Sequence, residues 1–568
     1  MSFLKQKNAV YSVSFSEATD EKPPPSPPPP FSDGSIALTN SSGTIGTFNR
    51  PRVRSDAKGG TIIEGENPHA DGYFDAQGRY IRSHGLHWII TGLFVVGDLA
   101  GGGLVALPTA MIQSGFYYGM VGILVMCFVA GYTSYALGVS WMILLRRWPE
   151  YRSHTRKPYP ELAYRACGAR VKFITSASIL VTQFGVSVVY LLLSAKNIRD
   201  FVETFFHKSF SYCYVIMIVA LVLTPVMFLK SPADFWAAVV LAMFTTSAAV
   251  MLIIIGASMD HEACAPHKDM PDFHPVNYFL ALGTLIFSFG GHAAFPTIQH
   301  DMRRPAEFTK STVLAFIVTG IMYLPVCAIA YATYGDSLRD SIINSLQVEW
   351  IQRTVNLLIT IHCILTLTIV INPIMQESEE FFKVPQEFGR KRVIVRCSML
   401  FLVVFVAESI PTFGPLLDLV GGSTLTMTRH SFLLSFNQFN RIDCSIIFPC
   451  IFYLYLDAID RKTREKGDIG EAEPVTFKEV IRGTDRVTLG ICCFIIVVGT
   501  VGGAAATFSA INGLSTTHFV PPCYLQPFLH HADDAAASTS SINCCGHFQN
   551  VTAREGIVCS TADMKFYG

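Results

Sequence analysis

The stretch WIITGLFVVGDLAGGGLVALPTAMIQSG at residues 88–115 decides the fold class of this chain. It is long and apolar enough to cross a bilayer, whose hydrocarbon core of about 30 Å needs roughly 20 helical residues. Asp98 nevertheless stands in its middle, and three consecutive glycines follow at residues 101–103. Both features weaken a membrane helix, since an acid is costly there and a glycine costs about 1 kcal/mol relative to alanine. The pattern predicts a membrane helix that is broken near its centre.

Two interpretations of this break stay open. In the first, Gly101, Gly102 and Gly103 expose backbone N–H groups at the start of a half-helix, where these groups can bind a carboxylate. In the second, the glycines only let neighbouring helices approach closely, and a nearby serine or tyrosine satisfies Asp98. The first interpretation makes Asp98 and the three glycines candidate substrate-binding residues.

A second segment, LGTLIFSFGGHAAFPTIQHDMRRP at residues 282–305, repeats the pattern. Gly290 and Gly291 interrupt it, and His292 follows at once. Two interrupted helices at corresponding positions indicate an inverted five-plus-five repeat with the binding site at its interface. Histidine titrates near neutral pH, so Asp98 and His292 can relay a proton. Alternatively, His292 is a hydrogen-bonded structural residue, and Asp98 holds the ammonium group of a substrate.

The remainder of the 568 residues shows that the whole protein is built for a membrane. Half of the residues are apolar and only 15% are charged, whereas soluble proteins carry about 25% charged residues. The 43 basic and 43 acidic side chains balance, so no overall field favours nucleic acid. This composition therefore excludes a nuclear, cytosolic or secreted protein. We expect eleven spans, at roughly 88–112, 119–145, 172–195, 211–229, 235–257, 277–297, 312–334, 352–375, 393–410, 414–457 and 485–512.

The two ends of the chain differ from this core. Residues 1–86 are polar and contain the run EKPPPSPPPP at 21–30, so we expect a disordered tail whose prolines form a stiff spacer or a ligand for a proline-recognition domain. Lysine and arginine crowd the connections at 146–172, 383–396 and 461–486, which places the N-terminus in the cytosol. An odd number of spans then puts residues 513–568 outside the cell or in a lumen.

That predicted outer tail contains sequence features that are typical of proteins exposed to an oxidising compartment. Asn550 begins a glycosylation sequon. Cys523, Cys544, Cys545 and Cys559 lie in the same tail, where they can form disulfides. Cys213 and Cys264, both expected near the outer face, form another plausible pair. No spacing of cysteines or histidines supports a metal site, and we expect no cofactor.

Five segments resemble the amino acid/auxin permease family. They are GDLAGGGLVALPTAMIQSG at 97–115, KPYPELAYRACG at 157–168, FSFGGHAAFPTIQHDMRRPAEF at 287–308, PTFGPLLDLVGGSTLT at 411–426 and FPCIFYLYLDA at 448–458. The resemblance implies an all-α polytopic membrane protein of the leucine-transporter type, with spans one to ten as the inverted repeat and an eleventh helix added. It also implies secondary active transport of amino acids or close relatives, driven by H⁺ or Na⁺.

By position, the resemblance also implies where substrate and ion bind. The substrate site falls on residues 101–103 and on Ser288, Phe289, Gly290, Gly291 and His292. A sodium site in this architecture uses carbonyls of span one and hydroxyls of span eight, for which Thr368 is the candidate. Thr368 and Asn372 can complete a cation or substrate site, or they can form interhelical hydrogen bonds.

One segment departs from the family pattern. RHSFLLSFNQFNRIDC at residues 429–444 interrupts span ten, and its removal leaves a continuous apolar helix. We interpret it as a retained intron, a splice variant or a gene-model error, or else as a true loop at a cavity wall. Its presence puts the activity of this isoform in question.

The sequence therefore predicts an amino acid transporter that works by alternating access in the plasma membrane, or alternatively in an endolysosomal membrane. We expect the transmembrane core at 87–458, a cytosolic loop at 459–484 and the last span at 485–512. The alternative from a different class is an amino-acid sensor that signals through its N-terminal tail. We find no G-x-S-x-G, H-E-x-x-H or other catalytic set, so we do not expect an enzyme.

Overall fold

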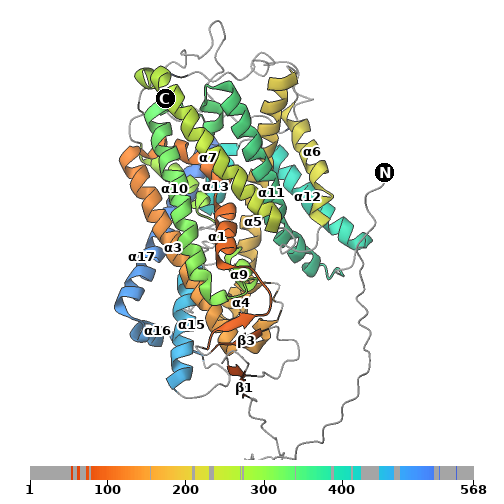
Figure 1. The fold of residues 1–568 in the computed structure, drawn as a ribbon, viewed down its shortest axis with the longest axis vertical. Helices are drawn as coiled ribbons and strands as arrows, with labels where there is room; N and C mark the ends of the chain where they lie inside the picture. Colours follow the sequence, from red (N-terminus) through yellow and green to blue (C-terminus); the bar gives the residue numbers. More distant parts are fainter. Residues whose placement is uncertain are drawn as a thin grey trace, which may run out of the picture. The chain divides into compact units, whose positions relative to one another are not determined.

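Long helices make up most of the protein in this computed structural model (Figure 1). The structure describes residues 53–55, 61–63, 72–75, 78–153, 155, 157–206, 211–228, 236–268, 270, 274–339, 341–385, 389–410, 413–423, 447–465, 474–516, 523–524 and 545. The helices are α1 (Trp88–Leu99), α2 (Gly102–Ser114), α3 (Phe116–Arg147), α4 (Pro158–Cys167), α5 (Ala169–Phe206), α6 (Tyr212–Leu223), α7 (Trp236–Cys264), α8 (Pro275–Ser288), α9 (Phe295–His300), α10 (Phe308–Tyr334), α11 (Glu349–Phe381), α12 (Arg390–Ser409), α13 (Phe413–Ser423), α15 (Ile447–Glu465), α16 (Phe477–Gly483) and α17 (Arg486–Thr516).

Within the described residues, six helices are long and apolar enough to cross a membrane. Helices α1 and α2 add a seventh span if the pair, bent by 55°, is counted as one. Helices α6 and α8 are apolar but shorter, with 12 and 14 residues. The protein is thus a mostly helical polytopic membrane protein, as the predicted all-α class requires of its core, while the predicted number of eleven spans and the inverted repeat stay predictions.

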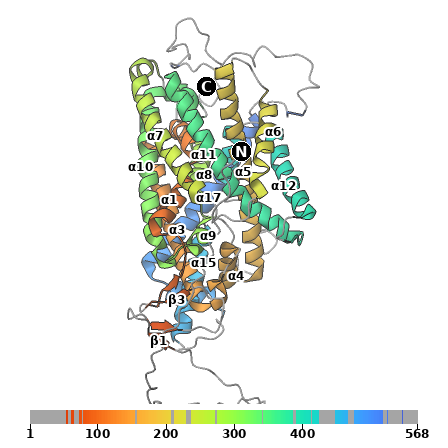
Figure 2. The same cartoon turned by 45° about the vertical axis from the view of Figure 1, so that its right-hand side comes forward.

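The helices pack so that the two interrupted segments are neighbours. Helix α1 lies against α10 and α7, and α2 lies against α8. Helix α11 packs between α5 and α7, and α13 contacts both α8 and α17. The views in Figures 1 and 2 show α10 running beside α1. Buried residues of α1, α2, α5, α7, α10 and α11 join in one hydrophobic core.

The ends of several helices follow directly from their sequences. Pro158 opens α4, where a proline loses no helical hydrogen bond. Gly168 ends α4 with a φ of 89°, a backbone angle that favours glycine. Thr476 and Glu479 form a capping box at the start of α16. The hydrogen bonds of Glu479 to the backbone and side chain of Thr476 lower the pKa of this exposed carboxyl.

The folded region begins before the predicted boundary at residue 87. Two small antiparallel hairpins precede α1, namely β1 (Val53–Ser55) with β2 (Thr61–Ile63) and β3 (Gly72–Phe74) with β4 (Tyr80–Arg82). Tyr80 is buried, and the Arg82 amide donates to the Arg303 carbonyl at 2.9 Å. The expectation of disorder up to residue 86 was therefore wrong for the second hairpin, because Tyr80 supplies an aromatic anchor in a segment whose average composition is polar.

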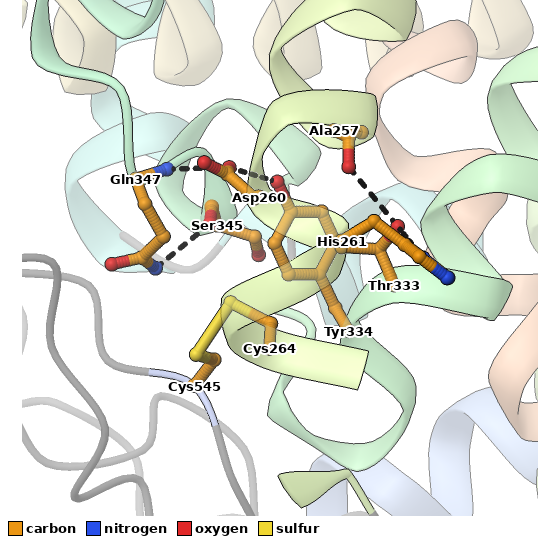
Figure 3. Close-up of a disulfide and its surroundings, with 9 residues drawn as sticks. All are labelled: Ala257, Asp260, His261, Cys264, Thr333, Tyr334, Ser345, Gln347 and Cys545. Carbon is orange, nitrogen blue, oxygen red and sulfur yellow. Dashed lines mark hydrogen bonds between the residues drawn. A yellow bond between two sulfur atoms is a disulfide. The ribbon is translucent and has the colours of Figure 1, made fainter. Parts of the chain in front are cut away.

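The expected disulfide between Cys213 and Cys264 was also wrong. The structure pairs Cys213 with Cys523, and Cys264 with Cys545. Both tail cysteines therefore reach the ends of helices α6 and α7, which sequence spacing could not reveal. Figure 3 shows the second bond beside Asp260, which accepts hydrogen bonds from the Tyr334 hydroxyl at 2.5 Å and the Gln347 amide at 2.8 Å. Asn550, Cys544, Cys559, the proline run and residues 429–444 lie outside the described residues.

Ion pairs link helices at the end of the bundle where the connections rich in lysine and arginine lie. Asp460 of α15 binds Arg146 and Arg147 of α3, the latter at 2.7 Å. Lys157 binds Glu377 and Glu380 of α11 at 2.5 and 2.8 Å. Burial alone would lower the pKa of Lys157, but its hydrogen bonds to the two carboxylates raise it. These pairs join α3 to α15, and the residue that precedes α4 to α11.

Candidate functional site

The first break in the chain lies between α1 and α2. Helix α1 ends at Leu99 and α2 begins at Gly102, so only Ala100 and Gly101 separate them. The Ala100 amide donates to the Val96 carbonyl at 2.7 Å, and the Gly101 amide donates to the Leu99 carbonyl at 3.0 Å. The amides of both linking residues are therefore satisfied from within the segment itself.

The three glycines after this break are covered by other helices. A Cβ atom on Gly101 would overlap the Tyr190 hydroxyl of α5 and lie 2.8 Å from Nε2 of His362. A Cβ atom on Gly103 would lie 2.6 Å from the Ser288 Cα of α8. Gly101, Gly102 and Gly103 are all buried, so they serve close packing in this structure.

The second break lies between α8 and α9 and is longer. It runs over residues 289–294, where the Gly290 amide donates to the Phe287 carbonyl at 3.0 Å and the Ala294 amide donates to the Gly291 carbonyl at 3.1 Å. Gly290 is exposed although its neighbours Phe289 and Gly291 are buried. Of the two breaks, the second one is therefore the one that exposes backbone.

A cavity of ≈ 60 Å³ lies where the two breaks meet. Its polar lining comes from Asp98, Thr182, Gln183, Tyr190 and His292, and its backbone lining includes Gly290 and Gly291. The remaining lining residues are Leu99, Met126, Ala130, Val186, Ile286, Phe287, Phe289, Ala293, Val370, Val420 and Gly421. A cavity of this size holds a few water molecules, so a larger ligand requires the walls to move.

Asp98 is the only acidic residue among the described residues that line this cavity, and no lysine or arginine lines it. The carboxylate packs against the second break, because a Cβ atom on Gly291 would lie 2.5 Å from the Asp98 Oδ2 atom. We find no hydrogen bond or ion pair from Asp98 to another described side chain. Among the described lining residues, Asp98 and His292 are the groups that can exchange a proton near neutral pH or bind an ammonium group.

His292 lies in the cavity wall but points to α3. Its Nε2 atom is 2.7 Å from the Thr133 hydroxyl and 3.3 Å from the Ala130 carbonyl. Asp98 and His292 thus share the cavity without a direct hydrogen bond between them in the described structure. A proton relay between the two would need an intervening water or a movement of one side chain.

The candidates of α11 lie away from this cavity. The Thr368 hydroxyl donates to the Leu365 carbonyl at 2.7 Å, and Asn372 accepts a bond from Gln376 at 3.4 Å. Neither residue lines the cavity, and neither does Ser288. The structure therefore brings Asp98, Phe289, Gly290, Gly291 and His292 together at the cavity. Thr368 and Asn372 do not line it, and the hydrogen bonds given above for these two residues lie within α11.

Several residues that contact the breaks were given no role from the sequence. His362 of α11 is buried beside Gly101, and its Nδ1 atom is 2.7 Å from the Thr246 hydroxyl of α7. Thr133 and Tyr323 also contact the breaks. Threonines and tyrosines are common in membrane helices as interhelical bonding residues, so no local pattern distinguishes these from others.

Other acids and possible metal ligands lie elsewhere. Asp418 of α13 is buried and accepts a hydrogen bond from the Thr284 hydroxyl of α8. In the part of the chain that the structure describes, no three histidine, cysteine, aspartate or glutamate side chains gather as a metal site would require.

The sequence is similar to those of known membrane transporters. Residues 84–467 match the family described as Transmembrane amino acid transporter protein. Amino acid transporter AVT1D of Arabidopsis thaliana is 23% identical over 432 residues, which are 73% of this chain and 68% of that protein. Lysine histidine transporter-like 1 of the same plant is 25% identical over 400 residues, 66% of this chain and 81% of that protein. Auxin transporter-like protein 3 of Medicago truncatula is 25% identical over 345 residues, 60% of this chain and 69% of that protein.

Proposed function

The chain belongs to the family of transmembrane amino acid transporter proteins, and from this premise we propose that it carries amino acids or close derivatives through the cavity beside Asp98. The family and the similar proteins are transporters rather than enzymes. The names of the relatives cover amino acids in general, lysine with histidine, and auxin. We therefore propose a small substrate with a carboxylate, and in most cases an ammonium group.

The observation that carries the proposal is the position of Asp98. The carboxylate lies in a cavity between two chain breaks, against Gly291 and near the exposed backbone of Gly290. Broken membrane helices supply free backbone groups for substrates and ions at the middle of a bilayer. An acid in a membrane segment marks a pathway for protons or ions.

We propose H⁺ as the coupling ion, with Na⁺ as the alternative. Asp98 can take up a proton from one side and release it to the other while the substrate moves. A sodium site would instead need several oxygen ligands, and the candidates Thr368 and Asn372 do not reach the cavity. The substrate ammonium group is a second possible partner of Asp98, and the same carboxylate can serve both at different steps.

We propose alternating access as the mechanism, which the small size of the cavity supports. A drug-sized ligand site usually occupies about 300–1,000 Å³, whereas this cavity measures ≈ 60 Å³. We propose that α1 with α2 and α8 with α9 separate to admit the substrate and close again around it. The inverted repeat, the plasma membrane as the location and the cytosolic N-terminus belong to the same proposal. No observation on the described residues favours the sensor alternative.

Uptake into proteoliposomes tests this function. Purified full-length protein, with and without residues 429–444, is supplied with a panel of labelled amino acids under an imposed pH gradient or an imposed Na⁺ gradient. We expect uptake driven by an inward H⁺ gradient. Uptake that needs Na⁺ would overturn the choice of ion, and activity only after the deletion would show that the insertion disables the protein. Amino-acid binding without uptake in either form would favour the sensor.

A further inference from the structure

Tyr323 of α10 contacts both chain breaks with a single hydroxyl. Its oxygen is 2.9 Å from the Leu99 carbonyl and 3.0 Å from the Ser288 carbonyl, the last residues of α1 and α8. The side chain is fully buried. A helix leaves its last carbonyls without helical partners. The Leu99 carbonyl also accepts from the Gly101 amide at 3.0 Å, whereas Tyr323 is the one donor to the Ser288 carbonyl among the bonds of the described residues.

One hydroxyl carries only one hydrogen. Tyr323 can therefore donate fully to one of the two carbonyls at a time, or share its proton between them. Either arrangement requires Leu99 and Ser288 to stay within reach of the same oxygen atom. If one break moves away from α10, the hydroxyl keeps a single partner and the other carbonyl loses its hydrogen bond to Tyr323.

The ring of Tyr323 adds a second contact to the longer break. Its centroid is 5.5 Å from that of Phe289, edge to face, and Phe289 lines the cavity. Helix α10 also holds the start of α1, where the Ser311 hydroxyl donates to the Trp88 carbonyl at 2.7 Å. Helix α10 thus holds both ends of α1, at Trp88 and Leu99, and the last residue of α8, Ser288.

We propose that Tyr323 is a positioning residue, which ties the end of α1 to the end of α8 so that the two breaks open and close together around the cavity. The inference rests on the proposed transport function, since concerted opening matters only if a substrate passes. It adds a specific residue outside the cavity lining, which acts through backbone carbonyls instead of touching the substrate.

The variant Tyr323→Phe removes the hydroxyl and retains the ring. Hydrogen–deuterium exchange of the full-length protein in nanodiscs, read by mass spectrometry, reports on each break separately. Because a hydrogen bond of ordinary strength is lost, we expect peptides over residues 96–104 and 286–294 both to exchange about fivefold faster. Acceleration of only one peptide, or of neither, would overturn the proposal.

Tyr212→Phe is the matched control. The Tyr212 hydroxyl donates to one backbone carbonyl, that of Leu192, at a similar distance of 2.9 Å. It lies on α6, away from both breaks. We expect this variant to leave exchange at both break peptides unchanged, and equal acceleration in the control would show that any lost tyrosine hydroxyl loosens the protein.

Transport gives a second readout. For Tyr323→Phe we expect the maximal uptake rate to fall about fivefold while the KM changes little, because the hydroxyl does not touch the substrate. A rise in KM with an unchanged maximal rate would place Tyr323 in the binding site and overturn the positioning role. If the protein takes up no amino acid either with or without residues 429–444, the proposed function fails, and the exchange result still decides whether the two breaks are tied.

The wild-type protein supplies a test that does not depend on the folding of a variant. A saturating mixture of the twenty standard L-amino acids should slow exchange at both breaks by the same factor. Protection confined to one break would contradict the proposal.

Discussion

The two chain breaks share a sequence pattern but differ in what surrounds them. At the first, the glycines at 101–103 are buried under Tyr190, His362 and Ser288, and only Asp98 and Leu99 reach the cavity. At the second, residues 289–293 all line the cavity, and Gly290 is exposed. The comparison shows that a glycine run in a membrane helix can serve packing at one site and backbone access at another.

The difference predicts opposite outcomes for glycine-to-alanine substitutions. The largest effect on folding is expected for Gly103→Ala, because the new Cβ atom would lie 2.6 Å from the Ser288 Cα, and backbone cannot yield cheaply. We expect a loss of about 1–3 kcal/mol in stability, as for other overpacked positions. Thermal unfolding of the purified protein measures it, and an unchanged melting temperature would show that the first break is looser than described.

Gly290→Ala should behave differently. Its Cβ atom would lie 3.2 Å from the Ile286 and Phe287 carbonyl oxygens, a close contact that a small adjustment relieves. We expect near-normal thermal stability but a KM for uptake raised several-fold, since the added methyl group stands at the exposed backbone of the cavity. A variant with wild-type uptake would separate this break from the substrate path.

The smallest effect on transport is expected far from both breaks. The disulfides from Cys213 to Cys523 and from Cys264 to Cys545 attach the tail to α6 and α7. Replacing Cys523 and Cys545 by serine should lower stability, typically by about 2–4 kcal/mol for each bond, while the uptake rate stays close to normal. Peptide mapping without reduction checks the pairing, and a linked peptide that joins Cys213 to Cys264 would refute it.

From the sequence we could predict which residues belong to the site, but not which other side chains surround them. Asp98, the two glycine groups and His292 stand out because acids, glycines and histidines are costly or rare in apolar helices. Which glycines face the cavity depends on Tyr190 and Ser288, which come from distant parts of the chain. No local pattern carries that information.

The lack of information on distant parts of the chain also explains the other differences between prediction and structure. Cys213 and Cys264 were recognised as cysteines near one face, but their partners are about 300 residues away, at separations of 310 and 281. Tyr323 looks like any tyrosine in an apolar helix until the ends of α1 and α8 are placed beside it. Tyr80 was hidden in a polar segment, although a single buried aromatic residue is enough to fix a short hairpin.

The neutralising variant Asp98→Asn tests the central claim most directly. Acid-driven uptake is measured in proteoliposomes beside Asp260→Asn, a buried acid outside the cavity that is bonded by Tyr334 and Gln347. If Asp98 couples the proton, its variant should be inserted normally yet lose about 100-fold in acid-driven uptake, as expected when a proton-transferring group is removed. The Asp260 variant should keep most of its activity. Normal acid-driven uptake by a well-inserted Asp98→Asn protein would contradict the account.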